Sequence, residues 1–109
     1  KYIIVNDWEA VPETMNIHRL ERPVYLRRKH YGDILDKIMK EQNTNASGIT
    51  VVGDIWELDL ALPQYFGMAV GLTPNKTTPQ YEKDVVLNYK RGFIANGLEE
   101  VYMELRKRR

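Results

Sequence analysis

The sequence of 109 residues contains no cysteine, only two histidines and a single serine. The missing cysteine excludes disulfide frameworks, thiolate metal sites and cysteine nucleophiles. His18 and His30 lie too far apart for the spacing of two zinc ligands on one helix turn. Ser47 lacks the G-x-S-x-G pattern of a hydrolase nucleophile, so we interpret it as a turn residue. Several common catalytic arrangements are therefore excluded.

Long apolar runs and a strong excess of one charge are also missing. The run Tyr2–Val5 is too short for a signal peptide, and no run approaches the roughly 20 apolar residues of a membrane span. The net charge is +1, with 43% hydrophobic and 28% charged residues, which is typical of globular proteins. We therefore expect one domain over residues 1–109, without a membrane segment and cytoplasmic.

What the sequence does contain is an uneven distribution of charge. Residues 31–60 hold six acidic residues and two lysines, whereas both ends of the chain are mildly basic. A surface with two signs can pair with a copy of itself. Together with an amphipathic C-terminal segment, this pattern predicts a homo-oligomer.

Hydrophobic periodicity predicts short strands over residues 2–5, 24–28, 49–61 and 68–70, the third bent at Gly53 or split into two there. In that third strand, alternation places Glu57 and Asp59 on one face. Residues 6–23 carry no clear period, and we interpret them as loop with at most a helical turn near Thr14.

Two segments have a helical period. Tyr31, Ile34, Leu35, Ile38 and Met39 form an apolar stripe, which predicts a helix over about 31–42. Thr78 followed by Pro79 is a helix-start pattern, which predicts a long helix over about 79–108, with a split possible at Asn96–Gly97. The order of elements predicts an α+β fold in which a small, mostly antiparallel sheet packs against these two helices.

The strongest functional signal is a basic segment interleaved with tyrosines. Arginine forks hold phosphates, and tyrosine rings stack on bases. Lysine and threonine before the second helix indicate another anion site. We therefore predict a non-enzymatic binding protein for a phosphate-bearing ligand, either nucleic acid or nucleotide, without a cofactor or metal. The predicted ligand-binding residues are Arg22, Tyr25, Arg27, Arg28, Lys29, Tyr31, Lys76 and Thr77.

Two alternatives stay open. The acids Asp54, Glu57 and Asp59 could hold a hard cation and serve a metal-dependent phosphodiester hydrolase. The same acidic segment, or the apolar loop around Tyr65, Phe66 and Met68, could instead contact a protein partner, as in an inhibitor of a larger enzyme. If Tyr65, Phe66 and Met68 belong to the core instead, they are not available to contact a partner.

Overall fold

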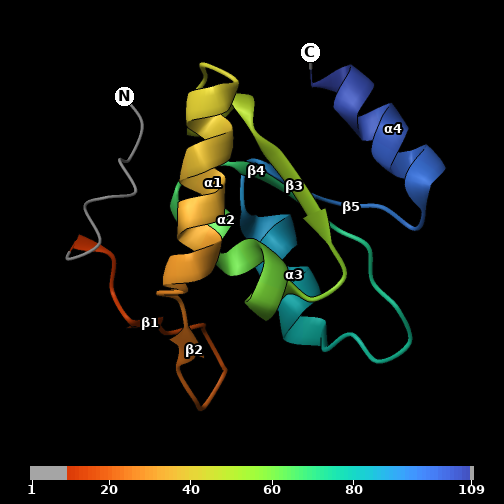
Figure 1. The fold of residues 1–109 in the computed structure, drawn as a ribbon. Helices are drawn as coiled ribbons and strands as arrows, with labels where there is room; N and C mark the ends of the chain where they lie inside the picture. The colour runs from red at the N-terminus through yellow and green to blue at the C-terminus, as the bar shows by residue number, and fades with distance from the viewer. Residues whose placement is uncertain (1–9, 109) are drawn as a thin grey trace.

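The structure is a computed structural model that describes residues 10–108 (Figure 1). The predicted strand over residues 2–5 lies outside the described residues. Within these residues, the strands of two sheets alternate with four α-helices, so the fold is α+β as predicted. In order, the elements are β1 (Thr14–Met15), β2 (Val24–Tyr25), α1 (Lys29–Glu41), a 3₁₀ turn (Ala46–Gly48), β3 (Thr50–Gly53), the π-helix η3 (Trp56–Leu60), α2 (Ala61–Tyr65), β4 (Ala69–Leu72), α3 (Gln80–Asn88), β5 (Gly92–Ile94) and α4 (Leu98–Lys107).

The larger sheet is parallel, so the prediction of a mostly antiparallel sheet is wrong. Its strands follow the order β3-β4-β5, with Thr50 opposite Ala69 and Val70 opposite Gly92. Helical segments connect each strand to the next and carry the chain back to the starting edge, which makes neighbouring strands parallel. All four residues of β4 are buried, as is typical of a central parallel strand.

The two faces of this sheet have separate apolar clusters. Val70 and Leu72 belong to the main core, together with Trp56 of η3 and Leu35 of α1. On the opposite face, the ring of Phe93 lies over Gly71, where a Cβ would come within 2.4 Å of it. A small cluster of Phe93, Ala95, Val101 and Leu105 attaches α4 there. Figure 1 shows α4 away from the other helices.

The predicted helix over 31–42 is confirmed as α1, which begins two residues earlier and ends at Glu41. Only half of its apolar stripe is core. Leu35 and Met39 are buried, whereas Ile34 and Ile38 are 45% and 39% exposed. The strand predicted over 24–28 is shorter than expected, since β2 covers only Val24–Tyr25. It pairs with β1, and β1 takes the place of the helical turn considered near Thr14.

The single long helix predicted over 79–108 is wrong, because β5 interrupts it. Tyr89 leaves α3 with extended backbone, and its hydroxyl donates to the Met68 carbonyl at 2.6 Å. Arg91 donates to the Ser47 carbonyl at 2.9 Å. These contacts hold the segment after α3 beside the sheet, where it forms β5. The possible split at Asn96–Gly97 matches only the start of α4, which Gly97 precedes, because α3 has already ended at Asn88.

The strand predicted over 49–61 is correct only up to Gly53. Beyond it the chain forms η3 and then α2. Trp56 and Leu60 are both fully buried and four residues apart, which is a helical spacing. The buried carboxylate of Glu82 accepts hydrogen bonds from the first two backbone N–H groups of η3, both at 3.0 Å. Those N–H groups lack partners within the turn, so Glu82 stabilises the helical path.

Within residues 10–108, none of the helices has the length and apolar character needed to cross a bilayer.

Candidate functional site

The loops that follow β3 and β4 meet at one edge of the molecule, because parallel strands all end at the same edge of their sheet. They line an open cavity of about 280 Å³, which we call the carboxyl-edge cavity. Ligands of open α/β sheets usually bind at this edge. Its lining residues are Arg22, Asp54, Ile55, Glu57, Asn75, Thr77, Thr78, Pro79, Tyr81 and Glu82.

Two carboxylates lie at the end of β3. Asp54 directly follows the strand, is exposed, and has no hydrogen bond or ion pair recorded with the described residues. The side chain of Asp59 folds back over the strand end, where its Oδ2 accepts a hydrogen bond from the Ile55 N–H at 3.2 Å. A Cβ on Gly53 would lie 2.7 Å from that oxygen. Only glycine therefore lets the Asp59 carboxylate sit against the end of the strand.

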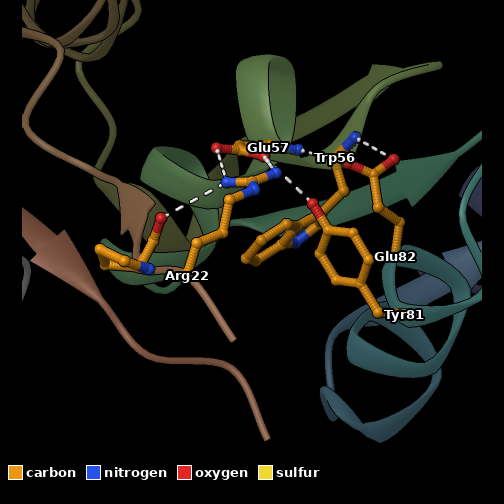
Figure 2. A network of polar contacts seen from close by, with 6 residues as sticks. Arg22, Trp56, Glu57, Tyr81 and Glu82 are labelled. Atoms are coloured by element: carbon orange, nitrogen blue, oxygen red, sulfur yellow. Dashed lines mark hydrogen bonds and ion pairs between the residues drawn. The ribbon is translucent and has the colours of Figure 1, made fainter. Parts of the chain in front are cut away.

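Arg22 reaches this edge from the loop between β1 and β2. Its guanidinium donates to both carboxylate oxygens of Glu57, at 3.0 and 2.7 Å, and to the Pro23 carbonyl (Figure 2). The hydrogen bonds from Arg22 hold the pKa of Glu57 below its usual value. The pair therefore stays ionised at neutral pH and keeps a fork of N–H donors beside the cavity.

Tyr81 and Glu82, neighbours on α3, complete the network in Figure 2. The hydroxyl of Tyr81 donates to Glu57 Oε1 at 3.1 Å, and its ring meets Trp56 edge-on. Burial, followed by the contact with Glu57, raises the pKa of Tyr81 to about 12. Tyr81 therefore remains a neutral hydrogen-bond donor across the physiological range.

The loop after β4 is held by side-chain contacts within itself. Asn75 Oδ1 accepts hydrogen bonds from the Thr77 N–H and hydroxyl, at 2.8 and 2.7 Å. Thr78 Oγ1 accepts from the Asn75 N–H at 2.8 Å, and α3 starts after Pro79. The helix-start pattern Thr78–Pro79 does precede α3, but Thr78 does not cap it, because the N-cap residue is Pro79. Thr77 lines the cavity, whereas Lys76 is exposed outside its lining.

The structure distributes the predicted basic segment over several local contacts. Arg27 donates to the Val11 carbonyl, and Lys29 pairs with Asp33 at 3.0 Å. Arg28 lies 5.2 Å above the Tyr25 ring centroid, with its Nε buried and without a hydrogen-bond partner. Of this segment, only Arg22 lines the carboxyl-edge cavity. Ligand binding by the other members stays a prediction.

Tyr31, the last predicted residue of this segment, contacts the backbone of η3 near the end of β3. Its hydroxyl donates to the Asp59 carbonyl at 2.5 Å, and burial raises its pKa to about 12. A ring held in this way positions η3, and Tyr31 does not line the carboxyl-edge cavity.

The apolar loop around residue 66 is core. Phe66 and Met68 are 3% and 0% exposed, which removes both as contacts for a protein partner. Tyr65 retains a 37% exposed side chain.

No set of three or more histidine or acidic side chains gathers as a metal cage within residues 10–108. Magnesium at phosphate sites commonly uses one or two carboxylates, with phosphate and water supplying the other oxygens. Asp54, which lines the cavity, and Asp59, which contacts the lining residue Ile55, match this smaller set in residue type.

A second, larger cavity of about 530 Å³ lies between the β1–β2 loop and α3. Tyr81 lines both cavities. Sequence reasoning did not single out Tyr81, Glu82 or Asn75. The available signal for Glu82 was its position four residues before the apolar Val86, on the same face of the predicted helix.

Comparison of the chain with protein-family models, with curated proteins and with solved structures gives no match.

Proposed function

We propose that the protein binds a phosphate-bearing ligand together with a divalent cation in the carboxyl-edge cavity. The observation that carries this proposal is the meeting of opposite chemistries at one strand end. Asp54 in the cavity lining, and Asp59 next to it through its contact with Ile55, offer oxygen ligands for a cation, while the Arg22 guanidinium offers N–H donors for phosphate. A cation between carboxylate and phosphate removes the repulsion that the acids alone would exert.

The role of Arg22 in this proposal follows from its geometry. A guanidinium has five N–H donors in a planar fork, and Glu57 and Pro23 together use only its NH1 and NH2 groups. The side chain is 57% exposed, so it can turn towards a phosphate at small cost. A bound phosphate then replaces Glu57 as the anionic partner of Arg22.

The test is titration calorimetry of the full chain with inorganic phosphate, with and without Mg²⁺. We expect Mg²⁺ to strengthen phosphate binding, and Asp54→Asn to abolish that gain, because Asp54 is the exposed carboxylate of the cavity. Asp36→Asn is the matched control, since Asp36 lies on α1 and pairs with Lys40. Equal phosphate affinity with and without Mg²⁺ would contradict the proposal.

A second candidate, metal-dependent hydrolysis of phosphodiesters, is favoured by the position of Asp54 immediately after a parallel strand. A bound cation there can polarise a phosphoryl oxygen or activate a water molecule. Release of 4-nitrophenol from bis(4-nitrophenyl) phosphate, dependent on Mg²⁺ and on Asp54, would establish this activity. Tight phosphate binding without turnover would leave binding as the function.

A further inference from the structure

The larger cavity contains most of the unused hydrogen-bonding groups of this region. Asn16 comes from the β1–β2 loop and Asn88 from the end of α3, and neither has a hydrogen bond recorded with the described residues. Gln64 accepts from the Trp56 indole at 2.9 Å through its oxygen, which leaves its two amide N–H donors for other partners. Three primary amides thus border one open cavity.

The remaining walls combine aromatic and apolar side chains with one acidic residue, Asp84, and two basic ones, His18 and Arg19. The rings of Tyr81 and Tyr89 line the cavity beside Ile17 and Val85. Asp84 keeps one carboxylate oxygen available, because Gln80 donates only to Oδ1. A volume of about 530 Å³ lies within the usual range for small-molecule sites.

Tyr81 connects this cavity to the carboxyl-edge cavity. Its hydroxyl contacts Glu57 in the smaller cavity, while the residue also lines the larger one. One molecule lying along Tyr81 can therefore place its phosphate at the sheet edge and its organic group among the amides.

On the basis of the proposed function, we infer that the ligand is a nucleotide whose base occupies the larger cavity. Primary amides carry a donor and an acceptor side by side, which matches the edge of a nucleobase. Tyrosine rings provide faces on which a flat base stacks. The Asp84 carboxylate can accept from an exocyclic amino group. A sugar or another ligand with only hydroxyl groups would form one hydrogen bond with each amide instead of a donor–acceptor pair. It would also lack a flat face to stack on the tyrosine rings.

The experiment is calorimetric titration of the full chain, with Mg²⁺ present, using four kinds of probe in parallel. These are inorganic phosphate, ribose 5-phosphate, the four common nucleoside 5′-monophosphates and the corresponding nucleosides. We expect at least one nucleotide to bind about tenfold or more tightly than inorganic phosphate and than ribose 5-phosphate. Asn88→Leu should remove this gain and leave the phosphate affinity unchanged. Asn16→Ala, on a different element, should reduce it independently.

Leu87→Ala is the matched control, because Leu87 is 64% exposed on α3 and lies outside the cavity lining. Equal binding of phosphate and all nucleotides would overturn the inference and leave the proposed function standing. Nucleoside binding without phosphate binding would make the larger cavity an independent site, which overturns the spanning ligand. If no probe binds, both proposals fail.

Discussion

Tyr31 joins α1 to the turn that carries Asp59, through a single hydrogen bond of 2.5 Å to a backbone carbonyl. Its pKa is raised from 10.0 to about 12, chiefly because burial disfavours the phenolate. A tyrosine with a raised folded pKa stabilises the fold fully below its ordinary pKa. That contribution is lost as the pH rises through the folded value.

We therefore expect the free energy of unfolding to fall between about pH 10 and pH 12. Tyr31→Phe should be less stable by about 1 kcal/mol at neutral pH, because it lacks the hydrogen bond, and should lose less stability as the pH rises. Urea denaturation at several pH values measures both effects. Tyr102→Phe, on the exposed side of α4, is the control. Parallel pH profiles for Tyr31→Phe and the unmodified chain would contradict this assignment.

Single residues also show where sequence reasoning reaches its limit. Charge and residue type singled out Arg22 and Thr77 as predicted ligand-binding residues, and both line the carboxyl-edge cavity, but the partners of Arg22 were not predicted. Its contact with Glu57 spans 35 residues and depends on how the β1–β2 hairpin lies on the sheet. A contact between residues so far apart in the sequence leaves no signal in the local sequence pattern.

At the scale of elements, the helix η3 depends on a side chain from another helix. The Glu82 carboxylate is 3% exposed and accepts from the N–H groups of Trp56 and Glu57. Hydrogen bonds to a charged group contribute about 1.5–3 kcal/mol each, and losing an acceptor leaves a buried donor without a partner.

We expect Glu82→Gln to lower the free energy of unfolding by about 2–3 kcal/mol, since the glutamine amide offers one acceptor and turns a donor towards the other N–H. Glu99→Gln, on the exposed first turn of α4, should change stability by less than about 0.5 kcal/mol. Thermal unfolding followed by circular dichroism compares the two variants. Similar stabilities would show that Glu82 is not the partner that fixes η3.

The elements differ in how well local sequence predicts them. α1 was predictable because its apolar stripe and its ion pairs, such as Lys40 with Asp36, repeat at helical spacing. β5 was not, because three residues between two helical patterns carry too little periodicity. The parallel arrangement had one readable signal, the wholly apolar segment Ala69–Leu72, which is typical of a strand buried on both faces.

At the scale of the whole molecule, two apolar clusters of unequal size stabilise different parts of the fold. The main core joins one face of the hairpin, which carries Val24, and α1, η3 and α3 to one side of the sheet. The smaller cluster attaches α4 through Val101 and Leu105, while Leu98, Tyr102 and Met103 of the same helix remain 86%, 72% and 54% exposed. Little apolar area therefore holds α4 in place.

We expect the amides of α4 to exchange with solvent faster than those of β4 and α1, because opening α4 exposes only the smaller cluster. Native-state hydrogen exchange followed by NMR measures this difference. Phe93→Ala should accelerate exchange in α4 and leave α1 nearly unchanged. Equal protection of α4 and β4 would mean that the two clusters open together. Protection that rises with protein concentration would support the predicted homo-oligomer.

The β1–β2 hairpin stands outside the repeating strand-helix pattern, yet it contributes Arg22 to one cavity and Asn16 to the other. The two carboxylates at the strand end, Asp54 and Asp59, come from the segment that follows β3. The hairpin also supplies the buried Val24 to the main core. A substitution in the hairpin therefore alters core packing and both cavities together, so an engineer could not retune the proposed ligand choice there independently of folding stability.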